Sequence, residues 1–102
     1  MARFDLYETR SSRTPYLLDV QSGLLDSLTT RVVLPVLPRN TIQGAVIPRL
    51  NPTIMIAQQP CIVMTQNMAT VPAEKLRKRL TNVEAEHRDQ ITAAIDFLFQ
   101  GF

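Results

Sequence analysis

The chain has 102 residues, of which 45% are hydrophobic, and a formal net charge of +2. This length suits a single globular domain, expected to span residues 1–102, and so small a charge does not by itself indicate a nucleic-acid-binding protein. No apolar run reaches the roughly 20 residues that a membrane span needs, and the N-terminus lacks a signal-peptide pattern. The single cysteine, Cys61, excludes an internal disulfide, so we expect a cytoplasmic protein without membrane attachment.

The N-terminal part of the sequence predicts β-strands. Residues 2–7 alternate between the two faces of a strand, and residues 16–20 predict a second strand. Residues 31–37 are apolar on both faces, which is typical of a strand covered on both sides. Pro35 cannot donate a ladder hydrogen bond, so it predicts an edge, a bulge or a strand crossing at that point.

Prolines divide the middle of the chain into short strands. Residues 53–57 and 61–65, separated by a short connection, predict a hairpin. Residues 68–71 predict one more short strand, which Pro72 ends. The basic run at residues 75–79 has two interpretations, a solvated loop or a surface that docks to phosphate.

The C-terminal part predicts an amphipathic helix that runs to the end of the chain. Thr81 and Glu84 fit a capping box, with Asn82 as the alternative cap. Six residues at helical spacing form one largely apolar stripe: Val83, His87, Ile91, Ala94, Ile95 and Leu98. Residues 97–99 are all large and apolar, and each step round a helix is about 100°. At least one of these three must therefore face a partner.

Two further features mark candidate contact surfaces. Leu24 and Leu25 follow a glycine in a predicted loop, where they either fold back onto the core or form one contact patch with the helix tip. Asp96 lies in the last helical turn, where the macrodipole disfavours negative charge, so it is either a tolerated surface residue or a functional one. Gly101 stands where a helix C-terminal glycine is expected.

The sequence offers few groups for catalysis. His87 projects from the apolar stripe, which predicts a core or half-buried histidine rather than a general base, and Cys61 is predicted to be a small buried hydrophobe. The three glycines form no phosphate-binding loop, and no cysteine–histidine cluster suggests zinc. We therefore assign no catalytic, cofactor-binding or metal-binding residue and expect no cofactor.

Several segments match known motifs in a fixed order along the chain. They are Leu18-Asp19-Val20-Gln21-Ser22 with Leu24-Leu25-Asp26, Arg31-Val32-Val33-Leu34-Pro35, Met68-Ala69-Thr70-Val71-Pro72, and Ala93-Ala94-Ile95-Asp96-Phe97-Leu98 with the closing Gly101-Phe102. This ordered set, which runs from about residue 3 to residue 102, resembles the CcdB-type toxins of bacterial toxin–antitoxin pairs. Each motif alone is weak, but their order and the matching length are specific.

The resemblance implies both a fold and a function. The fold would be mainly β (α+β), an SH3-like twisted antiparallel barrel with a small side sheet and one C-terminal α-helix. The protein would be a homodimer without enzymatic activity, which binds the A subunit of DNA gyrase and traps the cleaved-DNA complex. A cognate antitoxin would neutralise it through a disordered C-terminal segment. The toxin–antitoxin complex would repress its own operon, so that operator DNA is contacted only through that complex.

Carried over by position, the resemblance also implies a gyrase-binding site. Its residues would be Leu24, Leu25, Asp96, Phe99, Gln100, Gly101 and Phe102. This chain has Gln100 where the best-known family pattern has tryptophan, Phe102 where that pattern has isoleucine, and Asp96 where it has asparagine.

Two other functions stay open. The related MazF/Kid toxins share the implied fold and cleave RNA, for which Arg31 and Thr65 are candidate groups here. A non-toxic relative that retains only dimerisation and antitoxin binding is the third possibility, and Gln100 is the residue that suggests it.

Overall fold

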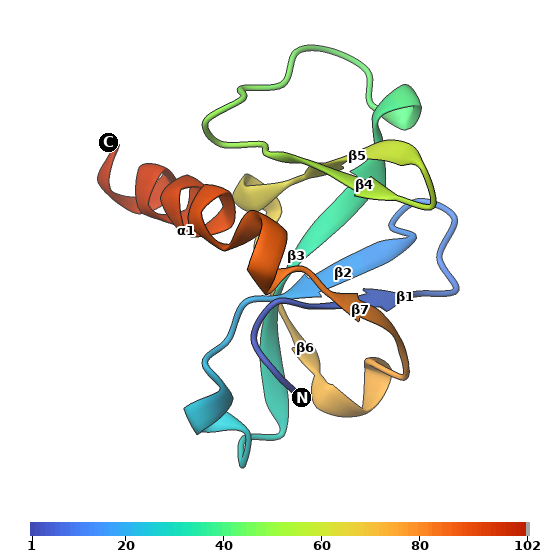
Figure 1. The fold of residues 1–102 in the computed structure, drawn as a ribbon. Coiled ribbons are helices and arrows are strands. Elements are labelled where there is room, and N and C mark those ends of the chain that lie inside the picture. The colour runs from blue at the N-terminus through green and yellow to red at the C-terminus, as the bar shows by residue number, and fades with distance from the viewer. Residues whose placement is uncertain (102) are drawn as a thin grey trace.

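One long central strand, β3 (Thr30–Pro38), organises the sheet (Figure 1). In the computed structural model, which describes residues 1–101, the strand order is β4-β5-β3-β2-β1-β7, and β6 pairs separately with β3. All of these pairings are antiparallel. The other strands are β1 (Asp5–Glu8), β2 (Tyr16–Asp19), β4 (Thr53–Ile56), β5 (Gln59–Val63), β6 (Ala69–Pro72) and β7 (Lys78–Asn82).

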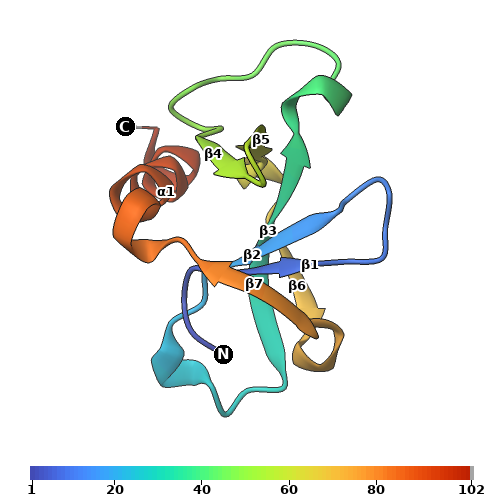
Figure 2. The same cartoon turned by 45° about the vertical axis from the view of Figure 1, so that its right-hand side comes forward.

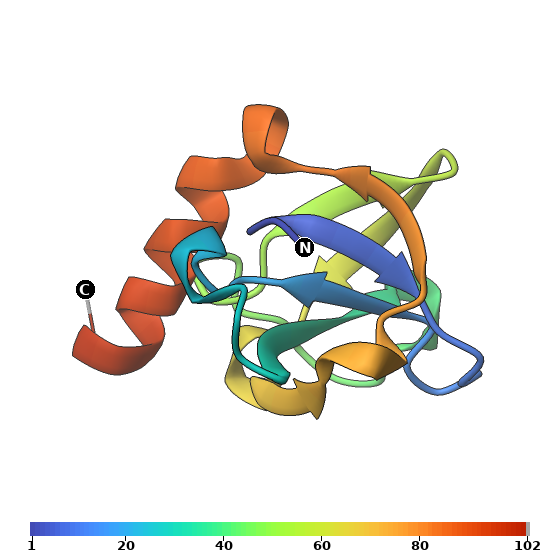
Figure 3. The ribbon, with the colours of Figure 1, turned by 90° about the horizontal axis from the view of Figure 1, so that it is seen from below.

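The sheet curls into a half-barrel, and the α-helix α1 (Glu84–Gln100) packs against it (Figures 2 and 3). The predicted mainly β barrel with one C-terminal helix is therefore confirmed. Where a small side sheet was expected, β6 joins the same sheet as a branch beside the first half of β3. Within residues 1–101, no helix combines the length and the apolar character that crossing a membrane requires.

Strand β3 is covered on both faces, as its sequence predicts. Leu34 and Val36 belong to the main core, which also contains Ile91 of the helix. Val33 points the other way, into a smaller core with Tyr7 and Leu76. Apolar residues on both sides of β3 are therefore needed, because the strand separates two cores.

Pro35 lies where β3 changes partners. Along one edge, the first half of β3 pairs with β6 up to Val33, and the second half pairs with β5 from Val36 onwards. Pro35 falls between these two ladders, and its carbonyl accepts a hydrogen bond from the amide of Met64 at 2.8 Å. An edge, a bulge or a strand crossing was predicted at Pro35, and the structure shows a change of partner strands there, since a residue without an N–H fits the gap between two partners.

The first strand begins later than predicted, at Asp5 rather than at residue 2. Phe4 has a φ of 72°, in the left-handed region, and the Asp5 amide bonds the Ala2 carbonyl at 3.1 Å. This turn precedes the strand and directs the buried Phe4 ring into the main core. An aromatic residue with positive φ is uncommon, and no sequence pattern indicates it.

The predicted hairpin is confirmed as β4 and β5, with register Ile54↔Cys61 and Ile56↔Gln59. Its two turn residues, Ala57 and Gln58, have φ values of 51° and 67°. Positive φ at both central positions is the geometry of a type I′ turn, which matches the twist of the flanking strands. The turn is therefore made without the asparagine and glycine that usually mark it, which explains why β5 starts earlier than expected.

The interpretation of residues 75–79 as a loop is wrong for its second half. Lys78 and Arg79 begin β7, which pairs with β1 through Leu6↔Thr81 and Tyr7↔Arg79. The strand is almost wholly exposed along its length and lies at the edge of the sheet, so it carries no alternating apolar pattern. Edge strands are commonly polar for this reason, and their sequence resembles that of a loop.

The helix is held at its start by Asn82 rather than by Thr81. The Oδ1 atom of Asn82 accepts a hydrogen bond from the Glu84 amide at 2.9 Å, whereas Thr81 is part of β7. The predicted stripe faces the sheet, with Ile91 and Ala94 buried. The alternative cap, Asn82, is therefore the correct one, because its side chain bonds an amide of the first helical turn although its backbone still pairs with Asp5 in the strand ladder.

Candidate functional site

An exposed apolar tip ends the helix. Phe97 and Leu98 are half-buried, whereas the side chain of Phe99 is 70% exposed. Gly101 has a φ of 79°, and its amide bonds the Phe97 carbonyl at 2.9 Å. This left-handed residue ends the helix as predicted and carries the backbone away from it. Of the three adjacent large side chains, Phe99 is the most exposed.

The polar residues of the tip frame this ring. Asp96 and Gln100 are both exposed, and within residues 1–101 no basic side chain lies in the last turn to offset Asp96. The prediction for Phe102 falls outside the described residues. An exposed aromatic ring flanked by a carboxylate and an amide has the composition of a protein-binding surface rather than of a catalytic centre.

The second candidate surface is the short 3-10 helix η1 (Gly23–Leu25). Leu24 is 94% exposed and Leu25 is 47% exposed, so the expectation that loop leucines fold back onto the core is wrong here. The hydroxyl of Ser22 caps η1 by accepting a hydrogen bond from the Leu24 amide at 3.1 Å. This capped turn presents both leucines to solvent.

Buried polar groups anchor η1 from below. Gln21 is buried, and its amide nitrogen donates to the carbonyl of Leu25 at 3.4 Å and to that of Thr30 at 3.2 Å. The Nη1 atom of Arg31 lies 3.6 Å from a carboxylate oxygen of Asp26, the residue that ends η1. These contacts hold the two ends of the segment, so η1 keeps its position without burying the leucine side chains.

The two candidate surfaces lie on the same side of the molecule but stand apart. Figures 1 and 2 show η1 at the lower left and the C-terminal end of α1 at the upper left, and the two are separated along the vertical direction of both views. Within one chain, the predicted site residues therefore form two protrusions rather than one patch. A partner that touches both must span the distance between them.

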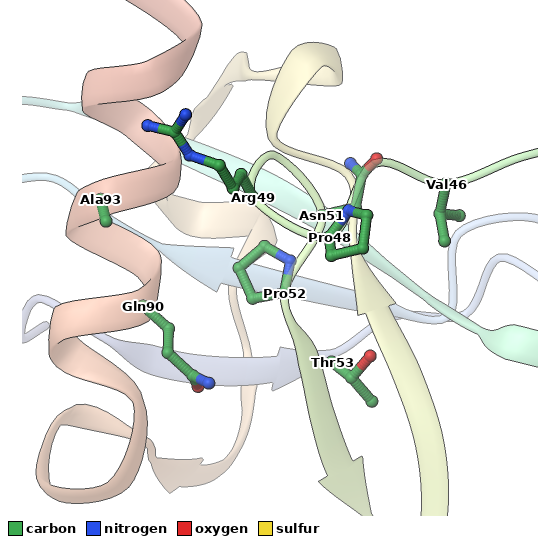
Figure 4. A pocket seen from close by; sticks show the side chains of 8 residues that line it. All are labelled: Val46, Pro48, Arg49, Asn51, Pro52, Thr53, Gln90 and Ala93. Carbon is green, nitrogen blue, oxygen red and sulfur yellow. The ribbon is translucent and has the colours of Figure 1, made fainter. Parts of the chain in front are cut away.

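A hollow beside the helix was not predicted from the sequence. It lies between α1 and the segment that precedes β4, and Figure 4 shows Gln90 and Ala93 on the helix side. Its lining residues are Val46, Pro48, Arg49, Asn51, Pro52, Thr53, Gln90 and Ala93. The guanidinium carbon of Arg49 lies 4.3 Å from the centre of the Phe97 ring, a cation–π contact that covers this ring.

The two candidate groups for RNA cleavage are both completely buried. Arg31 is held by Asp19 through two hydrogen bonds, from Nε at 2.8 Å and from Nη2 at 3.0 Å. The hydroxyl of Thr65 is also buried, and within the described residues it has no hydrogen-bond partner. Neither group faces solvent, where a substrate would have to meet it.

The remaining reactive side chains, Cys61 and His87, are buried and half-buried, respectively. Cys61 is buried in the main core, and burial raises the pKa of its thiol. His87 is half-buried, and its Nδ1 lies 2.8 Å from Oε1 of Gln90. The predicted burial of both side chains is confirmed. Within residues 1–101, no group of histidine, cysteine and carboxylate side chains is arranged to hold a metal ion.

A family model described as CcdB protein matches residues 3–101 of the sequence. The chain belongs to the CcdB family. Membership covers nearly the whole chain and confirms the resemblance to this family of toxins from toxin–antitoxin systems.

Solved structures with the same fold extend beyond this family. The crystal structure of an Mtb toxin superposes with a TM-score of 0.73 and 19% sequence identity. The match covers 92% of this chain and 99% of that toxin. An endoribonuclease in complex with its cognate antitoxin, from a mycobacterial species, has 15% sequence identity and a TM-score of 0.76. The match covers 96% of this chain and 93% of that endoribonuclease. The Mycobacterium tuberculosis toxin MazF-mt6 has 18% sequence identity and a TM-score of 0.74. The match covers 93% of this chain and 95% of that toxin. At such identities, these similarities establish the fold alone.

Proposed function

We propose that this CcdB-family toxin binds the A subunit of DNA gyrase and traps the complex in which gyrase has cleaved DNA. The observation that carries the proposal is the exposed Phe99 at the end of a helix that Gly101 terminates. A ligand that prefers the cleaved state of gyrase stabilises that state in proportion to its differential affinity, without chemistry of its own.

The helix tip would supply the main contact. Phe99 would bury its ring in the partner, since aromatic side chains dominate the energetics of protein interfaces. Asp96 and Gln100 would form hydrogen bonds at the rim. Gly101, which has no side chain, would let the two backbones approach closely. Phe102, by its position in the sequence, would add the aromatic surface that tryptophan supplies in the best-known family pattern.

The η1 segment would supply the second contact. Leu24 and Leu25 are exposed on a capped turn that buried Gln21 anchors, so they would enter an interface with little further loss of conformational freedom. Because η1 and the tip stand apart, we propose that they contact separate parts of gyrase. A homodimer would present two copies of each surface.

We propose that the protein acts by binding rather than by catalysis. The endoribonuclease alternative is favoured by the fold shared with an endoribonuclease. It would require Arg31 and Thr65, or other groups, to activate a ribose hydroxyl and stabilise phosphate charge. Both of these side chains are completely buried here, and Arg31 is already paired with Asp19, which supports the binding function instead.

The proposed partners follow from the family. A cognate antitoxin would bind the toxin through a disordered C-terminal segment, and the complex of the two proteins would repress their operon by binding operator DNA. The third alternative, a non-toxic relative, would retain dimerisation and antitoxin binding only.

A growth experiment separates these functions. Expression of the chain in bacteria should stop growth and induce the DNA-damage response while cellular RNA stays whole. Deletion of Gly101 and Phe102 should abolish both effects, and the Met55→Ala variant, which alters an exposed apolar side chain elsewhere, should retain them. Growth arrest with RNA cleavage that survives the deletion would establish the endoribonuclease. Normal growth with tight antitoxin binding would establish the non-toxic relative.

A further inference from the structure

A second hollow lies between the loop that follows β1 and the segment that leads into β7. It has a volume of about 680 Å³, and four basic residues line it, Arg10, Lys75, Arg77 and Lys78, together with Glu8, Thr9 and Leu17. Figures 1 and 3 place these segments on the opposite side of the molecule from the C-terminal end of α1. The hollow is therefore separate from both surfaces assigned to gyrase.

One buried residue, Leu76, anchors the segment that carries two of these basic side chains. Leu76 is only 6% exposed and packs in the smaller core with Tyr7 and Val33. Its neighbours on either side, Lys75 and Arg77, are both exposed. Because Leu76 anchors the segment, the two charged side chains are directed outward and the backbone between them is fixed.

The hollow carries an excess of positive charge. Its one carboxylate, on Glu8, is already paired with Lys78, and this hydrogen bond raises the pKa of the Lys78 amine. Within residues 1–101, no carboxylate lies within salt-bridge distance of Arg10, Lys75 or Arg77. The nearby Arg79 differs, because it is paired with Asp5 at 2.9 Å. Three cations therefore remain available to an anionic ligand.

The surroundings of the hollow favour a phosphate backbone over unpaired bases. Single-stranded nucleic acid is bound by stacking bases on exposed aromatic rings. Of residues 1–101, no aromatic residue lines the hollow: Tyr7 is buried in the smaller core, and Tyr16 packs against the main core. Arginine and lysine without such rings bind duplex phosphates irrespective of sequence.

We propose that this hollow binds the phosphate backbone of duplex DNA through Arg10, Lys75 and Arg77. The contact reads no bases, so the choice of operator remains with the antitoxin, and the toxin adds sequence-independent affinity. The inference does not depend on gyrase being the target, because neither candidate gyrase surface takes part.

The test is the fluorescence anisotropy of a labelled duplex of mixed sequence, titrated with the purified protein over a series of salt concentrations. With three phosphate contacts, log K should fall against log salt with a slope of about −3, which is about 40-fold between 50 and 200 mM salt. The variant Lys75→Glu/Arg77→Glu should bind more than tenfold more weakly at 50 mM salt, with the slope reduced to about −1.

The matched control changes charge to the same extent outside the hollow. Arg39→Glu/Arg88→Glu replaces two exposed arginines that do not line it and should lower the affinity less than threefold. Circular dichroism checks that both variants fold. Equal losses in the two variants, or no binding of the original protein at 50 mM salt, would overturn the proposal. Tighter binding of a single strand, or of poly-glutamate of equal charge, would overturn the assignment to duplex DNA.

Discussion

Arg31 and Asp19 form a buried ion pair in which Nε donates to Oδ2 at 2.8 Å and Nη2 donates to Oδ1 at 3.0 Å. Both side chains are completely buried, and Nη2 also donates to the carbonyl of Gln21 at 3.0 Å. The hydrogen bond to Asp19 raises the pKa of Arg31 above its already high value, so the arginine stays charged. The pair ties β2 to β3 directly beneath the segment that presents Leu24.

We expect Arg31→Met to lower the free energy of unfolding by about 3–5 kcal/mol, because it leaves the Asp19 carboxylate buried without a partner. The double variant Asp19→Leu/Arg31→Met should lose clearly less than the single one, since it removes both charges. Urea denaturation measures both values. A loss below about 1 kcal/mol for Arg31→Met would show that the pair is not important for stability.

The start of α1 offers a second test, because Asn82 joins three elements. Its side chain caps the helix at Glu84 and donates to the Arg3 carbonyl and to Asp5, each at 2.9 Å. Asn82→Ala should therefore destabilise the protein by about 2 kcal/mol. Thr81→Ala, at the neighbouring position, should cost less than about 0.5 kcal/mol, because that side chain is exposed and does not cap. Thermal or urea unfolding that ranks the two variants in the opposite order would contradict this capping scheme.

Stability should fall in acid partly because of Asp5. Burial acts to raise the pKa of this carboxyl group, but hydrogen bonds from Asn82, the Ala2 amide and Arg79 together hold the pKa below its ordinary value of 3.8. A lowered folded-state pKa means that the contribution is fully present above 3.8 and is lost as the pH falls through the folded value. The wild-type protein should therefore have a larger free energy of unfolding than Asp5→Asn at about pH 6. This difference should shrink towards about pH 2.5.

Urea unfolding at several pH values measures this difference, with Asp89→Asn on the exposed side of the helix as the control. If the difference in free energy of unfolding between the wild-type protein and Asp5→Asn stays constant with pH, the lowered pKa of Asp5 is contradicted.

Phe99 should matter for binding and not for folding. Phe99→Ala removes a ring that is 70% exposed, so we expect a change of at most about 0.5 kcal/mol in the free energy of unfolding. Its affinity for the gyrase A subunit should fall at least tenfold, about 1.4 kcal/mol, because the ring would be buried in that interface. Met55→Ala is the matched control, since Met55 is exposed to a similar extent on β4. Calorimetric titration of each variant into the A subunit gives the affinities, and equal affinities would remove Phe99 from the interface.

The sequence predicted those parts of the fold whose pattern reflects burial. The two apolar faces of β3 and the stripe around Ile91 follow from side chains that must leave water, whereas the change of partner strands at Pro35 follows from its missing N–H. Strand β7 was missed because its partner β1 lies more than 70 residues away, and an exposed edge strand needs only backbone bonds. The positive φ of Phe4 was missed for a similar reason, since tertiary packing imposes it.

The candidate site was predictable at the helix tip and not at η1. Three adjacent large apolar residues cannot share one helix face, so the spacing of residues 97–99 alone predicts that one of them is exposed. The exposure of Leu24 depends instead on Gln21 and Arg31, whose side chains hold η1 through contacts that no local pattern specifies. The hollow beside Arg49 arises from the approach of a long loop to the helix and had no signal in the sequence.

The most direct test of the proposed function is a DNA cleavage assay with purified gyrase, supercoiled plasmid, ATP and this protein. We expect linear DNA to be released after treatment with detergent and protease, because the toxin holds gyrase in its cleaved state. Deletion of Gly101 and Phe102 should abolish the linear product while the variant remains folded. Absence of linear DNA with the folded original protein, or its persistence after the deletion, would contradict the proposal that the helix tip poisons gyrase.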